Sequence, residues 1–503
     1  MRTHPSSLTV LAAAAVCAAL AGPVSPPAAA TQVTGSVAPY DFNGDGRVDL
    51  AVGIPDWDGF DDADGQRVSN VGAVVVMWGG RDRVPETTLT PGEVDDGGLS
   101  RAGARFGSAL ASDDFDRDGY ADLAVGSPYE EGTPSHIDPG MGVVRVYYGD
   151  ASGLGSRQAV LPHAGLRGFG HALVATDLTG DGWPDLAVGA PFTAVPGAPT
   201  GFQTGEVAVL HGGPGGFDRG RSSLVARPSL LAEHFGEVLA AGDVNGDGAT
   251  DLVEGAAGDY EQWLADAIRP GHLTWALGAT GTGPTAARYV GGRPAGALAV
   301  GDVTGDGIDD VVSGSVVSRR FRPGAPMPPG RVTLFRGGSA GPETPGASVS
   351  QDAALVPGRE RAGDRFGAAL ELTDLDRDGR QDVLVGVPGK HQDAGRVVVL
   401  RGARGGFAQR DAIVLDQASG GIPGRPETGD RFGAAVAALD VSGDGRDDLA
   451  FGAPGEDGRR GSVTVVRTRG IFYVPSGVAA YSLESLQRPG GGPERKFGSV
   501  LGG

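Results

Sequence analysis

Seven short acidic segments carry oxygen-bearing side chains at one fixed spacing. Each segment is a nonapeptide with Asp at positions 1, 5 and 9, an Asp, Asn, Thr or Ser at position 3, and Gly at position 6. Side chains at alternate positions of a tight turn can point at one centre, and glycine lets the chain reverse. Oxygen ligands in a flexible loop suit Ca²⁺ better than Mg²⁺, which requires strict octahedral geometry. The spacing therefore predicts a calcium-binding loop in each of the seven copies.

The expected metal ligands are the side chains at positions 1, 3, 5 and 9. They are Asp41, Asn43, Asp45, Asp49, Asp114, Asp116, Asp118, Asp122, Asp177, Thr179, Asp181, Asp185, Asp243, Asn245, Asp247, Asp251, Asp302, Thr304, Asp306, Asp310, Asp374, Asp376, Asp378, Asp382, Asp440, Ser442, Asp444 and Asp448. A solvated Asx turn without metal is the alternative, and the sevenfold recurrence disfavours it. The formal net charge is −20, and seven Ca²⁺ ions would offset most of it.

The fourth copy also matches the EF-hand pattern, because Glu254 stands at position 12. An EF-hand loop lies between two helices, whereas the segments around this copy are short and rich in Val and Leu, as in strands. Val52 and Val125 occupy position 12 in the first and second copies. We therefore expect Glu254 to be a local variation on a strand.

The segments around the acidic loops predict the elements that must position them. Most copies have Phe-Gly eight residues before the loop, a Gly-x-Pro turn after it, and then a Val-rich run that opens with Gly. The Gly-x-Pro turns of copies four and five are degraded, and copy five has Ala295-Gly296 near the Phe-Gly position. Short alternating apolar runs bounded by turns indicate strands. Four strands in each unit of about 60 to 70 residues predict an all-β, seven-bladed β-propeller. A linear β-solenoid is disfavoured, because the strands come in groups of four without capping segments.

Closure of this ring is also predicted. The first copy has Val33 and Thr34 where the others have Phe-Gly, whereas an additional Phe497-Gly498 stands near the end of the chain. We expect the tail to supply the inner strand of blade one, which would hide an edge strand. Residues 31–503 then form a single propeller.

The first 30 residues have the pattern of a secretory signal peptide. Arg2 precedes an apolar run from Leu8 to Ala21, and small residues up to Ala30 suit cleavage there. The mature chain is therefore expected to be secreted, without a membrane span and without cysteine, since Cys17 lies in the signal. Its acidic composition disfavours nucleic acid as a partner. We expect a monomer whose partner is an extracellular protein or glycan.

Phe-Gly, the acidic nonapeptide and Gly-Ala-Pro together resemble the FG-GAP repeats of the integrin α-chain seven-bladed propeller. The likeness covers nearly all of the mature chain. It implies a secreted, calcium-binding propeller that engages ligands through loops on one face, with the metal loops joining the first and second strands of each blade. The propeller also resembles that of phospholipase D enzymes that cleave lipid anchors, although no room remains for their catalytic domain.

No catalytic constellation is recognisable in the sequence. Gly337-Gly338-Ser339-Ala340-Gly341 matches the G-x-S-x-G motif but follows a predicted strand without a helix after it, so we interpret it as a turn. The eight histidines are scattered. We therefore predict that the protein is not an enzyme, with an exported hydrolase or lyase for a polysaccharide or lipid head group as the alternative.

The loops between the second and third strands are the most variable part of the repeat. They hold 16, 13, 13, 13, 13, 6 and 6 residues in blades one to seven. Successive connections alternate between faces, so these loops lie opposite the metal loops. Aromatic residues on loops of a rigid scaffold indicate recognition, and the candidates are Trp57, Phe60, Tyr129, Tyr260 and Trp263. The first loop also carries aspartates that could hold a cation or a polar ligand, although a solvated acidic loop is the favoured interpretation; they are Asp56, Asp58, Asp61, Asp62 and Asp64. We predict a binding or adhesion module.

Overall fold

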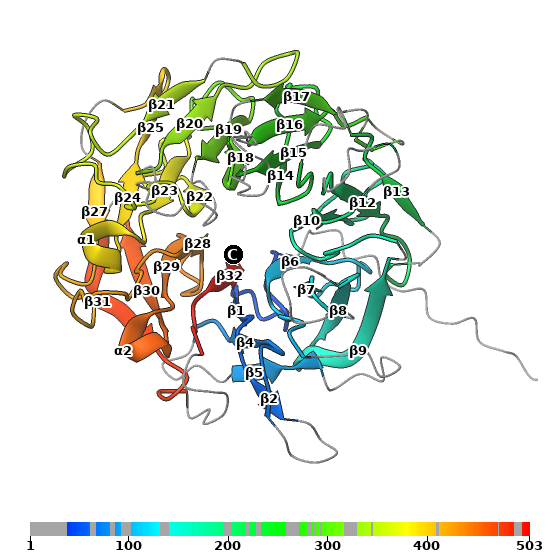
Figure 1. Ribbon diagram of the computed structural model, residues 1–503, viewed down its shortest axis with the longest axis horizontal. Helices are drawn as coiled ribbons and strands as arrows, with labels where there is room; N and C mark the ends of the chain where they lie inside the picture. Colours follow the sequence, from blue (N-terminus) through cyan, green and yellow to red (C-terminus); the bar gives the residue numbers. More distant parts are fainter. Residues whose placement is uncertain are drawn as a thin grey trace, which may run out of the picture.

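Valine-rich and alanine-rich segments, separated by glycine turns, form the sheets of a seven-bladed propeller (Figure 1). The computed structural model describes residues 38–60, 67–80, 86–91, 102–130, 140–163, 165–194, 197, 203–217, 221–227, 233–257, 271–279, 281, 283–284, 287–291, 294–315, 329–343, 346–408, 412–470, 472–486 and 495–502. The predicted signal peptide lies outside these residues. Within them, the predicted all-β, seven-bladed architecture with four strands in each blade is confirmed.

Each blade is an antiparallel sheet whose first strand lies nearest the central axis (Figure 1). Blades one to three consist of β32 (Val500–Gly502), β1 (Leu50–Ile54), β4 (Ala73–Met77) and β5 (Glu86–Leu89); β6 (Ala109–Asp113), β7 (Asp122–Ser127), β8 (Val143–Asp150) and β9 (Gly153–Pro162); and β10 (Leu173–Thr176), β11 (Asp185–Ala190), β12 (Glu206–Leu210) and β13 (Ser222–Leu224). Blades four and five consist of β14 (Val238–Gly242), β15 (Asp251–Ala256), β16 (His272–Ala276) and β17 (Arg288–Gly291); and β18 (Ala297–Gly301), β19 (Asp310–Gly314), β20 (Val332–Phe335) and β21 (Ala347–Val349). Blades six and seven consist of β22 (Leu370–Thr373), β23 (Asp382–Gly386), β24 (Val397–Leu400) and β27 (Ile413–Leu415); and β28 (Ala435–Leu439), β29 (Asp448–Ala453), β30 (Ser462–Arg469) and β31 (Phe472–Tyr481). Two small hairpins, β2 (Gly59–Phe60) with β3 (Arg67–Val68) and β25 (Gly402–Ala403) with β26 (Gly406–Phe407), extend blades one and six.

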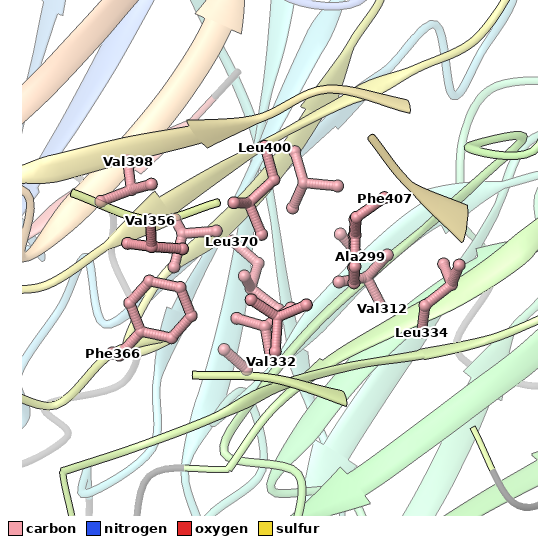
Figure 2. Close-up of a cluster of buried hydrophobic side chains, with 14 of the residues drawn as sticks. Ala299, Val312, Val332, Leu334, Val356, Phe366, Leu370, Val398, Leu400 and Phe407 are labelled. Carbon is pink, nitrogen blue, oxygen red and sulfur yellow. The ribbon is translucent and has the colours of Figure 1, made fainter. Parts of the chain in front are cut away.

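The hydrophobic core lies between neighbouring blades. The second strand of every blade is buried along its whole length, which explains its runs of Val, Leu and Ala. Between blades five and six, Val312 and Leu334 from one sheet pack with Leu370 and Val398 from the next, and Phe366 closes the same cluster (Figure 2). One blade alone could not bury these faces, so the blades depend on their neighbours.

The glycine before the third strand lies against the Phe-Gly segment of the next blade in every blade except blade four, where Gly271 lies beside Pro294. Gly72 bridges Phe106, and a Cβ built on Gly72 would lie 2.1 Å from the Phe106 carbonyl oxygen. Gly72 also has a φ of 90°, which L side chains rarely adopt. The same bridge joins Gly461 to Phe497, where the last blade meets the tail. The periodic glycines of the sequence are therefore required by close approach between blades.

The tail of the chain closes the ring. β32 pairs with β1 in antiparallel register, with Ala51 opposite Gly502 and Gly53 opposite Val500. Phe497 is fully buried between blades seven and one. Figure 1 shows the C-terminus at the centre of the ring, beside the first strand formed from the N-terminal part of the chain.

Helix is limited, in the described part of the chain, to two four-residue segments, α1 (Lys390–Asp393) and α2 (Glu456–Arg459). Both contain residues with positive φ, including His391 at 52° and Asp457 at 50°. They are therefore left-handed turns, and they form the short six-residue connections that the sequence gives blades six and seven.

Candidate functional site

In blades two to seven the acidic nonapeptide joins the first strand to the second, and in blade one, whose first strand is β32, it directly precedes the second strand, β1. We call the surface that the seven loops form the acidic-loop face. In blades two to seven, position 1 directly follows the first strand and position 9 is the first residue of the second strand, as with Asp114 after β6 and Asp122 in β7. The connections between second and third strands lie at the other end of the strands. We call that surface the opposite face.

Backbone hydrogen bonds hold the carboxylates of each loop in place. In blade two, Asp118 N and Gly119 N donate to the two oxygens of Asp114, each at 3.0 Å, and Tyr120 N donates to Asp118 Oδ1 at 3.1 Å. The same bonds from positions 5 and 6 to position 1 occur in all seven loops. Glycine at position 6 has φ near 80°, for example 86° at Gly182, which explains its invariance among the repeats.

The position-9 carboxylate ties each loop to its sheet. Asp122, which is fully buried, accepts bonds of 2.9 Å from Phe115 N within the loop and from Gly149 N at the end of the third strand. Six blades have this second bond, and the donors are Gly79, Gly149, Gly212, Gly278, Gly337 and Gly402. In blade seven Thr468 stands at the equivalent position, and Asp448 Oδ1 is buried without a hydrogen-bond partner.

Two loops bring three carboxylates together closely enough to hold a metal ion. Oxygens of Asp114, Asp116 and Asp122 lie within 4.8 Å of one another, as do those of Asp374, Asp376 and Asp378. In loop six, Asp376 Oδ1 and Asp382 Oδ2 are buried and have no hydrogen-bond partner in the described part of the chain. Buried carboxylate oxygens without donors fit a site whose ligand is a cation.

Burial makes these carboxylates costly to ionise without a counterion. Burial raises the pKa of Asp122 to about 8, and the neighbouring charges of Asp116 and Asp114 add to the rise, while hydrogen bonds from Gly149 and Phe115 oppose it. Burial likewise raises the pKa of Asp49 to about 7. A bound divalent cation would reverse this preference, because it stabilises the ionised form.

Neighbouring acidic loops contact one another around the ring. Position 7 of one loop lies over position 4 of the preceding loop: a Cβ built on Gly44 would be 2.8 Å from the Tyr120 ring, and the Arg117 guanidinium lies 5.0 Å from the centroid of Trp183. Backbone bonds reinforce these contacts, as with Ala121 N to the Asp41 carbonyl at 3.1 Å. The loops therefore form a connected layer.

The EF-hand-like fourth loop does not use Glu254 as a ligand. Glu254 lies in β15 and is buried, and its carboxylate accepts bonds from Gly236 N at 2.9 Å and from Thr274 Oγ1 at 2.7 Å. His272 Nε2 lies 3.0 Å from the same carboxylate. Burial, the largest single influence, would lower the pKa of His272, but the charge and hydrogen bond of Glu254 together with the charges of Glu237 and Glu233 raise it. Glu254 is a strand residue, as the sequence pattern indicates.

On the opposite face, Asp56 joins two blades. Its carboxylate binds Arg105 and Lys496, each at 2.8 Å. Burial alone would raise the pKa of Asp56, but the bond with Lys496 and the charge of Arg105 outweigh it and hold the pKa below its usual range. Asp56 is therefore an ion-pair partner within the chain, while Asp61, Asp62 and Asp64 of the same loop lie outside the described residues and the cation hypothesis for them stays a prediction.

An aromatic and histidine cluster continues from Arg105 across blades two to four. The Arg105 guanidinium lies 5.7 Å from the Tyr129 ring centroid, and Tyr129 lies 5.9 Å from Phe192. Phe192 in turn contacts His171 and His234, at 5.4 and 6.0 Å between ring centroids. Burial lowers the pKa of His171 to about 4, so this imidazole is neutral near pH 7.

The predicted ligand-contact residues are placed only in part. Tyr129 belongs to this cluster and is half-buried. Trp57 is also half-buried, where it packs against the core between blades seven and one, with Arg495 5.9 Å from its ring centroid. The side chain of Phe60, and Tyr260 and Trp263, lie outside the described residues. Sequence reasoning missed Arg105 and Lys496 as site residues, although a basic residue before Phe-Gly recurs in five copies.

Two features bear on catalysis. Residues 338–341 form a tight turn, with Gly341 N bonded to the Gly338 carbonyl at 2.6 Å, so Ser339 is in no strand-to-helix elbow. On the opposite face, burial raises the pKa of Glu456 to about 7; the nearby charges of Asp430 and Asp457 add to the rise, while a bond from Gln417 opposes it.

The repeats thus form a seven-bladed β-propeller with an acidic loop directly before the second strand of each blade. The FG-GAP repeat family matches residues 33–77, 106–136, 169–210, 366–400 and 432–466. The two unmatched blades, four and five, are those whose Gly-x-Pro turn is degraded.

Integrin α chains and a phospholipase are among the similar proteins. The chain is 38% identical over 160 residues to mouse integrin alpha-IIb, covering 31% of this chain and 14% of that protein. It is 28% identical over 453 residues to bovine phosphatidylinositol-glycan-specific phospholipase D, covering 79% of this chain and 50% of that protein. The chain thus spans about half or less of these relatives. The repeats, the integrin relatives and the seven-bladed ring make it an integrin-like FG-GAP propeller. In the described residues, no helix has the length and apolar character needed to cross a membrane.

Proposed function

We propose that this chain is a secreted, calcium-binding propeller that acts as an extracellular binding or adhesion module. In this proposal the acidic-loop face holds Ca²⁺ in up to seven loops, and the opposite face contacts a protein or glycan. The observation that carries the proposal is that the two faces of the ring present different kinds of side chain. Carboxylates with buried, unbonded oxygens recur on one face, while aromatic, cationic and histidine side chains vary from blade to blade on the other.

Calcium in this proposal is held by side chains at positions 1, 3, 5 and 9. Its chemistry is structural: it neutralises carboxylates that burial would otherwise protonate, and it fixes the turn between two strands. The loop contacts around the ring then make the whole face rigid. A rigid scaffold lowers the entropy lost when loops on its other face bind a partner.

Substitution of the aromatic residues on the opposite face tests the binding proposal directly. A glycan and protein array probed with the mature chain identifies a partner, and Trp57→Ala and Tyr129→Ala are then compared with Asp181→Ala. Both aromatic changes should weaken binding about tenfold or more, as for aromatic anchors in other interfaces. Asp181→Ala should reduce stability and leave affinity unchanged in protein that remains folded. Unchanged affinity in both aromatic variants contradicts the assigned face.

An exported hydrolase or lyase acting on a polysaccharide or lipid head group is the second candidate. Its supporting observation is Glu456, whose raised pKa of about 7 suits a general acid or base and which lies on the opposite face beside Asp430. The likeness to the phospholipase over most of this chain is consistent with it. A substrate panel with wild type and Glu456→Gln distinguishes the two: activity lost in the variant supports the enzyme, and no turnover by wild type contradicts it.

A further inference from the structure

On the opposite face, blades six and seven have the same backbone between their second and third strands. The turns α1 and α2 lie there on neighbouring blades (Figure 1), and they begin 66 positions apart, at Lys390 and Glu456. The second residue of each turn has a left-handed φ, 52° at His391 and 50° at Asp457. Side chains at equivalent positions of the two blades can therefore be compared directly.

In blade six, a buried lysine is held by three oxygen atoms, and we call this group the lysine site. Lys390 Nζ donates to Gln351 Oε1 at 2.5 Å and to Asp364 Oδ2 at 2.7 Å. It also donates to the backbone carbonyl of Arg359. The side chains of Lys390, Gln351 and Asp364 are all buried. An amide, a carboxylate and a backbone carbonyl thus surround one positive charge.

Blade seven keeps the oxygen-bearing residues of the lysine site but has a carboxylate in place of the ammonium. The amide and the carboxylate recur 66 positions later as Gln417 and Asp430, and both side chains are buried. The backbone carbonyl recurs at Arg425, and the lysine is replaced by Glu456. The charge at this position therefore changes from +1 to −1. Removing the cation from a buried pair leaves its carboxylate without compensation, which is costly.

The amide of Gln417 is only partly satisfied in blade seven. Its Nε2 donates to Glu456 Oε2, whereas in blade six it is Gln351 Oε1 that contacts the charged group. Gln417 is 6% exposed, and its Oε1 has no hydrogen-bond partner in the described part of the chain. A buried acceptor without a donor costs free energy. A half-turn of the amide exchanges its nitrogen and its oxygen, so this oxygen can face a cation as Gln351 Oε1 does.

Further negative charge lies around the blade-seven site. Glu427 and Asp457 stand where blade six has an arginine and a histidine. Burial raises the pKa of Asp430 and of Glu456, and the charges of Glu427 and Asp457 add to both rises. A bound cation would instead favour the ionised carboxylates.

We propose that Gln417, Asp430 and Glu456 bind one Ca²⁺ on the opposite face of blade seven, at the place that the Lys390 ammonium has in blade six. Two carboxylates, an amide oxygen and the backbone carbonyl of Arg425 are the hard oxygen ligands that Ca²⁺ prefers. One divalent ion also offsets the change of two charges between lysine and glutamate. The site goes beyond the proposed function, because none of the seven acidic loops contributes to it.

Counting bound ions tests the site on the full mature chain, with Ca²⁺ alone as the probe. Native mass spectrometry of calcium-saturated protein should show one ion fewer for Glu456→Lys than for wild type, because the new ammonium occupies the site as in blade six. The matched control, Asp457→Lys, makes the same charge change at the adjacent, exposed residue and should keep the ion. Equal counts for Glu456→Lys and wild type overturn the proposal, and so does the loss of one ion in both variants. The difference between variants does not depend on how many acidic loops hold calcium.

Stability in chelator tests the equivalence of the two blades. Without metal, the lysine of Glu456→Lys should pair with Asp430 and raise the melting temperature above that of wild type by at least about 1 °C. Added Ca²⁺ should reduce this difference, because it stabilises the wild-type site. A lower melting temperature for the variant in chelator contradicts the equivalence. Should Glu456→Lys fail to fold, Glu456→Gln, which is nearly isosteric, should lose the same single ion, and retention of every ion overturns the proposal.

Discussion

The two faces of the ring are built from the same seven repeats, but the residues of the acidic-loop face are nearly the same in every blade, whereas those of the opposite face differ between blades. On the acidic-loop face, six of the seven position-9 carboxylates accept an N–H from the third strand, and blade seven alone has Thr468 where the others have glycine. On the opposite face, the residue after the Gly-x-Pro turn differs between blades: it is Asp56 in blade one, Tyr129 in blade two, Phe192 in blade three and glycine in blades six and seven. The loop geometry tolerates little change, because the position-1 carboxylate of every loop accepts two backbone N–H bonds and the position-9 carboxylate accepts at least one. The other face has no such demand, so it is free to differ between blades, as recognition requires.

Removal of calcium should have the largest effect on stability, and it tests the role proposed for the acidic-loop face. The melting temperature should fall markedly in chelator, because each occupied loop would lose a cation and keep a carboxylate, such as Asp122 or Asp49, whose ionisation burial disfavours. A site occupied at a hundredfold excess over its Kd contributes about 2.7 kcal/mol of stability by mass action. Calorimetric melting with and without chelator measures the effect. An unchanged curve on protein shown to be metal-free would falsify calcium binding by this face.

Phe497→Ala tests the ring that joins both faces. Phe497 is fully buried where blade seven meets the tail, so truncation should cost about 3–5 kcal/mol of unfolding free energy. The matched control is Phe472→Ala, whose side chain is 69% exposed and should change stability by less than about 0.5 kcal/mol. Urea titration compares the two. Similar small effects in both variants would show that closure by the tail contributes little.

The pH dependence of stability tests whether His171, on the opposite face, is buried in its neutral form. His171 has a folded pKa of about 4, below its unfolded value of about 6.5, so the unfolded state binds the proton more tightly. Its contribution is complete above about pH 6.5 and is lost as the pH falls towards 4, by at most about 3 kcal/mol. The difference between the wild-type and His171→Gln profiles isolates this group. A difference that does not depend on pH contradicts the burial of a neutral imidazole.

Among these changes, Asp56→Asn should have the smallest effect on the free energy of unfolding. The neutral amide no longer balances Arg105 and Lys496, and because these partners are about one-third exposed, the loss should be about 1–2 kcal/mol. Chemical denaturation measures it at pH 7. The effect should be complete above the unfolded pKa of Asp56 and should disappear as the pH falls through its lowered folded pKa, where Asp56 is protonated in wild type as well. An effect that persists at low pH would assign Asp56 a role other than charge pairing.

The fold was predictable because periodic glycines and acidic loops mark the same points in every blade. The tail could be assigned to blade one from Phe497-Gly498 alone, since the first copy lacks that pair. The left-handed turns at α1 and α2 were not predictable, because His391 and Asp457 carry no marker of positive φ.

The loops and the opposite face were predictable to different extents. The local hydrogen bonds of the loops follow from Asp and Gly at fixed spacing. Contacts between distant residues do not: Asp56 and Lys496 are 440 positions apart and meet only because the ring closes. Asp56 therefore looked like a ligand in the sequence and is an ion-pair partner in the structure.

The pairing of β32 with β1 has a consequence for biosynthesis. β1 is synthesised before the strands of the other six blades, but its neighbour consists of residues 500–502, so blade one is completed only after those six blades have been made. A prematurely terminated chain leaves the edge of β1 unpaired and the Phe497 pocket unfilled. Unpaired edges and exposed apolar surface are what proteases and chaperones recognise. Only a chain that reaches residues 500–502 can therefore cover the edge of β1.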